Sequence, residues 1–208
     1  METAEAVGSL PSKSLLALLW TSFGIAFLLV ILRTAIRFKV GARLATEDFW
    51  IFLALATLLT SCILQTIQLP SLYYMSGVIA GVIPISEELI SIGDDYLRFE
   101  FANIVLFWTV LWCVKASFLA LYFKLFRDLP MYCRAWYILA AFTFCAYVGC
   151  WITALMSCHP ISNFFEFAEC NTEEDIWATR MSVYYSTVID IFTDLCSKCD
   201  CELTLGGC

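Results

Sequence analysis

The sequence predicts an all-α membrane protein, a polytopic helical bundle with four clear transmembrane helices, a weaker fifth and the N-terminus outside. Of its 208 residues, 61% are hydrophobic and 15% are charged, and the mean hydropathy is +0.81. A soluble domain of this size could not bury so much apolar surface. The apolar stretches lack the period-two alternation of a membrane β-barrel, which favours helices that satisfy their own backbone hydrogen bonds.

The first expected span covers residues 14–32, and no charged residue lies between Lys13 and Arg33. This stretch is longer than the apolar region of a signal peptide, Glu2 and Glu5 precede it, and no small-x-small cleavage site comes before Arg33. We therefore expect a retained transmembrane helix.

Three further spans are expected near residues 49–69, 99–123 and 135–157, each matching the roughly 20 apolar residues that cross a bilayer. We expect the second helix to end at Pro70 and the short apolar piece at 77–85 to lie in the interface or to cap the bundle. A less apolar fifth span is expected at 181–195. Residues 1–195 then form one helical membrane domain, and 196–208 form a Cys-rich tail.

The charges of the loops predict the orientation of the chain. Lys and Arg concentrate in the loops at 33–48 and 124–134, whereas the loops at 70–98 and 158–180 are acidic. Because positive charge stays on the cytoplasmic side, we expect the basic loops inside and the N-terminus outside. The net charge of -7 is then mainly exterior. The expected partner is the lipid bilayer of the plasma membrane or another endomembrane, and nucleic acid is not expected.

Lys115 is the only basic residue well inside a predicted span, where an unpaired charge costs several kcal/mol. One interpretation is that its side chain extends toward the inner headgroups, and we favour this one. The other is an intramembrane ion pair. Asp190 and Asp194 share one face of the fifth span, and Asp194 would reach a depth of about 20 Å, close to the depth of about 24 Å for Lys115. A pair with Asp194 is preferred on this count.

Cys158 and Cys170 flank the second acidic loop, and the other cysteines before the tail fall in spans or in a cytoplasmic loop. An oxidising exterior predicts a disulfide between them, and two free thiols are the alternative. Glu47 and Asp48 open the second helix, where the helix dipole alone would account for them. No nucleophile with its base, phosphate loop or zinc-ligand set is evident in the spans, so we do not expect an enzyme.

Several motifs in order resemble the fungal rhodopsin-like integral membrane family. They are Glu47-Asp48-Phe49-Trp50, Lys115-Ala-Ser117, the segment 121–126 with Tyr122, Cys158-x-Pro160 with Cys170, and the segment 187–195 with Asp190 and Asp194. The resemblance marks Asp48, Trp50, Ser117, Tyr122 and Pro160 as family motif residues. Departures are Glu47 at the first position of an acidic pair and Gly77-Val-Ile-Ala-Gly81 in the first outer loop.

The resemblance implies a receptor-like protein that senses an external signal, with a G protein or another cytoplasmic signalling partner in full-length relatives. The family has seven helices, so the chain is expected to be truncated after the fifth. A non-signalling membrane component, such as a transport subunit, or a non-functional truncated product is the alternative. No cofactor is expected, because the retinal Schiff base of opsins uses a lysine on the seventh helix and Lys115 lies on the third.

The tail carries Cys196-x-x-Cys199-x-Cys201 and ends at Cys208. It could form a metal clip or carry palmitoyl groups, but a zinc site needs four well-spaced ligands and Cys208 is a poor fourth. We therefore expect no metal site and interpret the tail as unrelated to the fold.

Overall fold

The computed structural model describes residues 11–41, 45–84, 89–126, 130–158, 165–166, 170 and 172–205, and it describes side chains for these except 126, 130–132 and 198–205. The described chain forms five helices: α1 (Ser12–Lys39), α2 (Thr46–Ile79), α3 (Leu89–Phe126), α4 (Pro130–Leu155) and α5 (Glu173–Leu205). Four of them, α1 to α4, are long and apolar enough to cross a membrane. The prediction of an all-α membrane bundle with four clear spans and a weaker fifth helix is confirmed.

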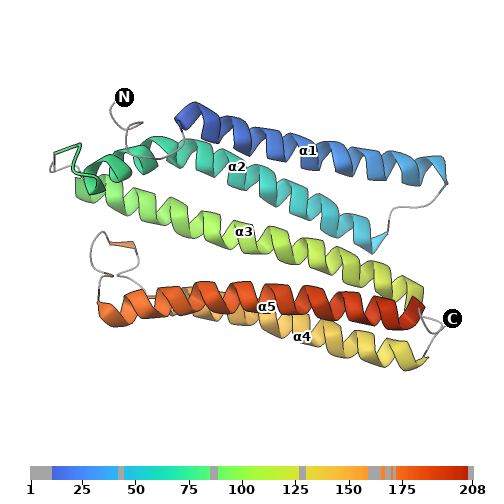
Figure 1. The fold of residues 1–208 in the computed structure, drawn as a ribbon. Helices are drawn as coiled ribbons and strands as arrows, with labels where there is room; N and C mark the ends of the chain where they lie inside the picture. The colour runs from blue at the N-terminus through green and yellow to red at the C-terminus, as the bar shows by residue number, and fades with distance from the viewer. Residues whose placement is uncertain are drawn as a thin grey trace.

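Consecutive helices run antiparallel and pack against each other, so that the chain winds through the bundle in sequence order (Figure 1). The most extensive contact is between α2 and α3. We call the end with Cys158 and Cys170 the disulfide end, and the end with Arg33, Arg37 and Lys124 the basic end. The first residues of α1, α3 and α5 lie at the disulfide end (Figure 1).

The prediction that the second helix ends at Pro70 is wrong, because α2 continues to Ile79 with Pro70 inside it. Proline removes one backbone donor, which weakens a helix locally but does not end it where packing continues on both sides. In the apolar piece at 77–85, residues 77–79 form the end of α2 and residues 80–84 form a turn, and residue 85 lies outside the described residues. Gly81, with φ of 72°, adopts the left-handed conformation that terminates such a helix.

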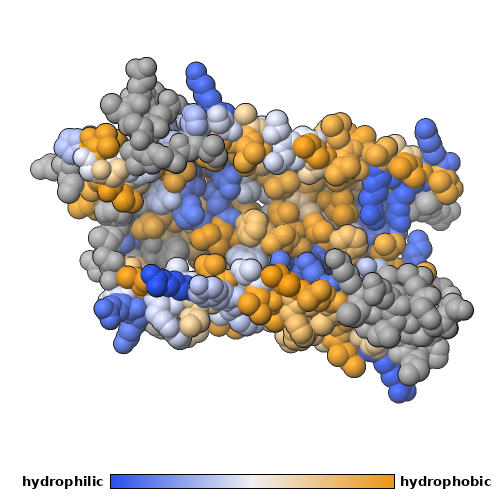
Figure 2. Space-filling model, in the orientation of Figure 1, coloured by the Kyte–Doolittle hydropathy of each residue, from blue (hydrophilic) through white to orange (hydrophobic). Residues whose placement is uncertain are grey.

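The apolar core lies between α3, α4 and α5. Trp112, Ala146 and Cys150 are buried there, and Trp108 and Ile189 pack against them. By contrast, α1 contains no buried residue, and large apolar side chains cover much of the outer surface (Figure 2). Such a surface suits lipid, which solvates apolar side chains that water would not.

Candidate functional site: three polar sites along the bundle

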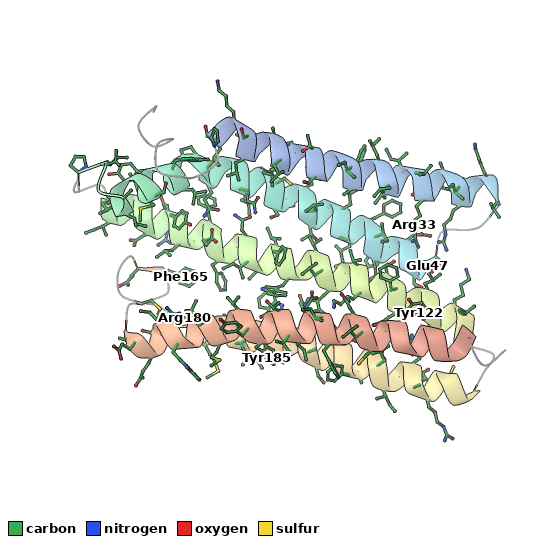
Figure 3. All side chains as sticks on the ribbon, viewed as in Figure 1. Arg33, Glu47, Tyr122, Phe165, Arg180 and Tyr185 are labelled. Atoms are coloured by element: carbon green, nitrogen blue, oxygen red, sulfur yellow. A yellow bond between two sulfur atoms is a disulfide. The ribbon has the colours of Figure 1, made fainter. Side chains whose placement is uncertain are left out.

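The first polar site lies at the basic end, and we call it the basic-end cluster: Arg33, Arg37, Glu47, Asp48 and Lys124. The guanidinium of Arg37 donates to the carboxylates of both Glu47 and Asp48. Arg33 Nε lies 3.6 Å from Asp48 Oδ1, and Lys124 Nζ lies 3.9 Å from Glu47 Oε1. Glu47 is only 1% exposed, and Arg33 and Glu47 point toward each other in Figure 3.

The first turn of α2 positions the two carboxylates. Asp48 accepts the backbone N–H of Ala45 at 3.1 Å, which satisfies a free donor at the start of the helix. Ser117 on α3 donates to the backbone carbonyl of Glu47 at 2.9 Å. Helix-end stabilisation of Asp48 therefore coexists with its ion pairs.

Sequence reasoning missed the partners of the acidic pair, because it interpreted Arg33 and Arg37 only as signals of orientation. The signal that could have revealed these partners is the short sequence separation between Arg37 and Glu47. Arg37 precedes Glu47 by 10 residues, so a short connection between two antiparallel helices returns the chain to the same level of the bundle.

The second polar site joins α3 to α5 around Lys115, and we call it the lysine site. Lys115 Nζ donates to the backbone carbonyl of Asp190 at 2.8 Å, to Thr193 Oγ1 at 2.7 Å and to Asp194 Oδ1 at 2.7 Å. Asp190 Oδ1 also lies 2.8 Å from this nitrogen. The side chain of Lys115 is 12% exposed, so it bonds within the bundle and does not extend toward the headgroups.

The lysine site brings together all three residues of the predicted charge pair, and the carboxylates of both aspartates lie within ion-pair distance of Lys115. An ammonium group has three protons, and the three acceptors above take them all. Asp190 Oδ1 therefore receives charge attraction but no hydrogen bond among the described residues. Trp112 places its ring 5.3 Å from Lys115 Nζ, which adds a cation–π contact.

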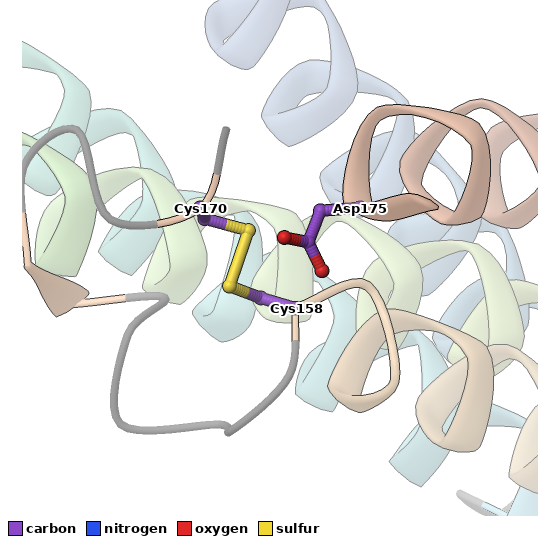
Figure 4. A group of neighbouring side chains, drawn as sticks. All are labelled: Cys158, Cys170 and Asp175. Carbon is purple, nitrogen blue, oxygen red and sulfur yellow. A yellow bond between two sulfur atoms is a disulfide. The ribbon is translucent and has the colours of Figure 1, made fainter. Parts of the chain in front are cut away.

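At the disulfide end, Cys158 and Cys170 form a disulfide with a Cα–Cα distance of 5.8 Å, within the usual range (Figure 4). Asp175 lies beside the two sulfur atoms. Thr172 Oγ1 accepts the backbone N–H of Asp175 at 3.2 Å and so caps the start of α5. The disulfide thereby ties the end of α4 to the segment that begins α5.

The third polar site lies in the wall of a cavity of about 760 Å³ near the disulfide end, which we call the disulfide-end cavity. Its wall is mainly apolar and includes residues of all five helices, for example Leu15, Gln68, Glu100, Ala154 and Ser182. Figure 2 shows two groups of hydrophilic residues below α1, one toward each end of the helix. The sequence did not reveal this cavity, because its volume depends on how far the five helices diverge.

A chain of hydrogen bonds between α2 and α3 leads to the cavity wall. Ser61 bonds Asn103 at 3.2 Å, Asn103 Nδ2 donates to Gln68 Oε1 at 2.7 Å, and Gln68 Nε2 donates to Glu100 Oε2 at 2.9 Å. Ser61, Gln68 and Asn103 are buried. Since buried amides in bonded series fix one another's orientation, Glu100 is held by a rigid polar support.

The family motif residues fall at different levels of the bundle. Asp48 and Ser117 belong to the contacts around Glu47, while Trp50 packs edge-on against Phe49 with ring centroids 5.6 Å apart. Tyr122 lies on α3 near the basic end (Figure 3). Pro160 lies outside the described residues.

Long apolar helices joined by ion pairs define a polytopic helical membrane protein. Residues 32–197 match the model of the fungal rhodopsin domain. Since this match covers more than half of the chain, the protein belongs to the fungal rhodopsin family. No curated protein and no solved structure matched the chain.

Proposed function

We propose that this protein is a receptor-like sensor that binds a ligand in the disulfide-end cavity and transmits a change of helix packing to the basic end. The observation that supports the proposal is the contribution of all five helices to one cavity wall. A ligand that prefers one spacing of these helices shifts the population toward that packing. In this proposal the protein performs no catalysis.

The basic end supports the second half of the proposal. The basic-end cluster links α1, α2 and α3 through buried carboxylates. A change in the relative position of these helices must stretch or exchange its ion pairs. Lys124, at 65% side-chain exposure, is available on the surface. If the basic end is cytoplasmic, as the distribution of Lys and Arg predicts, a G protein or another intracellular signalling partner would meet this surface.

The proposal can be tested without a known ligand by filling the cavity. Ala154→Phe would occupy part of the cavity from α4, and Ile138→Phe on the same helix, where Ile138 is 71% exposed, is the matched control. Spin labels on cysteines replacing Lys39 and Leu125, which is 58% exposed on α3, in a background without other reactive thiols, report the distance between α1 and α3 at the basic end.

We expect Ala154→Phe to change this distance distribution and Ile138→Phe to leave it unchanged. An unchanged distribution in a folded Ala154→Phe variant would contradict coupling between the two ends. It would favour a non-signalling membrane component instead.

A further inference from the structure

Glu100 on α3 presents a carboxylate at the wall of the disulfide-end cavity. One of its oxygens, Oε2, accepts a hydrogen bond from Gln68 at 2.9 Å. A carboxylate offers about four acceptor positions, so most of its capacity is unused. No lysine, arginine or histidine among the described residues lies within ion-pair distance of it.

This lack of a cation distinguishes Glu100 from three other acidic residues of the helices, Glu47, Asp190 and Asp194. Glu47 contacts Arg37, and Asp190 and Asp194 both contact Lys115. Within a membrane protein, a carboxylate away from bulk water is costly unless a positive charge or a proton compensates it. The polar support from Gln68 and Asn103 keeps Glu100 at the cavity wall.

The rest of the wall determines the shape of the matching ligand. Leucines of α1 and Phe107 and Trp108 of α3 make most of the wall apolar. Ligand pockets of small molecules measure roughly 300–1,000 Å³, and this cavity falls in that range. Its occupant therefore needs a substantial apolar body as well as a group that complements a carboxylate.

We propose that the disulfide-end cavity binds an amphipathic amine, with the protonated amino group on Glu100 and the apolar body against α1 and α3. The inference rests on the proposed function only for the consequence of binding, since binding itself requires no signalling. The same chemistry occurs in a free hydrophobic amine and in the headgroup of an aminolipid. The experiment below separates these two sources.

The probe is monodansylcadaverine, a hydrophobic fluorescent amine, and the matched control is its N-acetyl derivative, which keeps the apolar body and loses the charge. Both are titrated against the full chain in phosphatidylcholine nanodiscs, with empty nanodiscs subtracted. Binding is detected by the blue shift of dansyl emission and by energy transfer from tryptophan. Because Trp108 lies in the wall, Trp108→Phe should reduce this transfer.

We expect the amine to bind at least about tenfold more tightly than the acetylated probe, since hydrogen bonds to charged groups contribute about 1.5–3 kcal/mol. Glu100→Gln should remove this preference, whereas Glu174→Gln, the same change at an exposed residue of α5, should retain it. Ala154→Phe should weaken both probes. Competition by phosphatidylethanolamine in the nanodisc would identify an aminolipid as the source, and no competition would identify a free amine.

Equal affinity for the two probes, or a preference that survives Glu100→Gln, would overturn the proposal. So would undiminished binding by a folded Ala154→Phe variant. Failure of the proposed function has a different signature. Amine-selective binding that leaves the distance between α1 and α3 at the basic end unchanged would support the ligand class and contradict signalling. A change of this distance on filling the cavity, without a preference for the amine, would support signalling and contradict the ligand class.

Discussion

Arg37 of α1 donates a hydrogen bond to Glu47 of α2, whose side chain is 1% exposed. The same guanidinium also bonds Asp48, so one arginine connects α1 to two buried carboxylates. Helix α1 has no buried residue. The hydrogen bonds of Arg37 are therefore a principal contact that holds α1 against α2.

Replacing Arg37 by Met should destabilise the protein by about 3–5 kcal/mol, because it leaves two buried carboxylates with only the longer ion pairs to Arg33 and Lys124. Arg37→Lys should recover little of this, since an ammonium group cannot reproduce the fork of a guanidinium. Reversible unfolding in bilayer nanodiscs measures the effect. Lys39→Met, at an exposed residue two positions away, should change stability by less than about 0.5 kcal/mol. Equal effects of the two Met variants would contradict the role of Arg37.

Lys115→Met should lower the yield of folded protein in membranes, because it removes the cation that both aspartates contact. A double-mutant cycle with Asp190→Asn and one with Asp194→Asn separate the two contributions. We expect the coupling to Asp190 to be the larger, since the Asp194 side chain is 57% exposed and that of Asp190 is 26% exposed. Coupling below about 0.5 kcal/mol in both cycles would show that the sites act independently.

An insertion assay on residues 176–208 should precede these cycles. The aspartates can compensate Lys115 only if α5 enters the membrane, and α5 is the least apolar of the five helices. A segment that stays in water would make the cycles flat for that reason alone.

The disulfide should appear as a linked peptide containing Cys158 and Cys170 in a non-reduced digest. The double replacement by Ser should lower stability by about 2–4 kcal/mol, because the bond closes a short loop between α4 and α5. Cys145→Ser, at an exposed free cysteine of α4, is the control and should have little effect. Alkylation of both thiols without reductant would contradict the bond.

Gly149→Ala should disturb the packing of α4 against α5. An added Cβ would collide with the hydroxyl of Tyr185, whereas a Cβ at Gly24 would meet nothing within 4 Å. Both changes favour helix by up to about 1 kcal/mol, so Gly24→Ala should be neutral or stabilising. Gly149→Ala should be less stable than Gly24→Ala by about 1–3 kcal/mol, the usual cost of overpacking. Thermal unfolding of the two variants measures this difference. Equal unfolding temperatures would contradict the close contact between Gly149 and Tyr185.

The predicted orientation places Lys39 and Lys124 in the cytoplasm and Glu174 outside. In sealed cells, a membrane-impermeant maleimide should modify a single cysteine at residue 174 and should spare single cysteines at 39 and 124. All three residues are exposed in the structure, so accessibility within the fold does not bias the comparison. Labelling at 39 or 124 would refute the orientation, which rests on the excess of Lys and Arg in those loops.

Long-range patterns of the sequence predicted more of this structure than local ones. Apolar length gave the spans, since a bilayer of fixed thickness sets the number of residues required. Estimates of depth placed Lys115 and Asp194 at similar levels, and in the structure these side chains are in contact. A single local signal, Pro70, predicted the wrong end for α2. The prediction considered the backbone hydrogen bond that proline removes and did not consider the packing of α2 on α3.

The disulfide-end cavity and the partners of Glu47 could not be predicted from the chain in this way. Gln68 and Asn103 are separated by 35 residues, and only the close packing of α2 against α3 brings their amides together. Arg37 is both a positive charge that indicates the orientation of the chain and the hydrogen-bond partner of Glu47. The first role can be inferred from the excess of Lys and Arg near it. The second depends on the angle between α1 and α2, which the sequence does not specify.

The contacts of Lys115 also impose an order on biosynthesis. Lys115 precedes Asp190 by 75 residues and Asp194 by 79, so α3 is made before the carboxylates that neutralise it exist. Until α5 is made, Lys115 is an uncompensated charge in the bilayer. Such a charge is a feature by which cellular quality control can recognise a membrane protein that has not finished folding. Packing of α5 against α3 pairs this charge, so the lysine site separates chains in which α5 has docked from chains in which it has not.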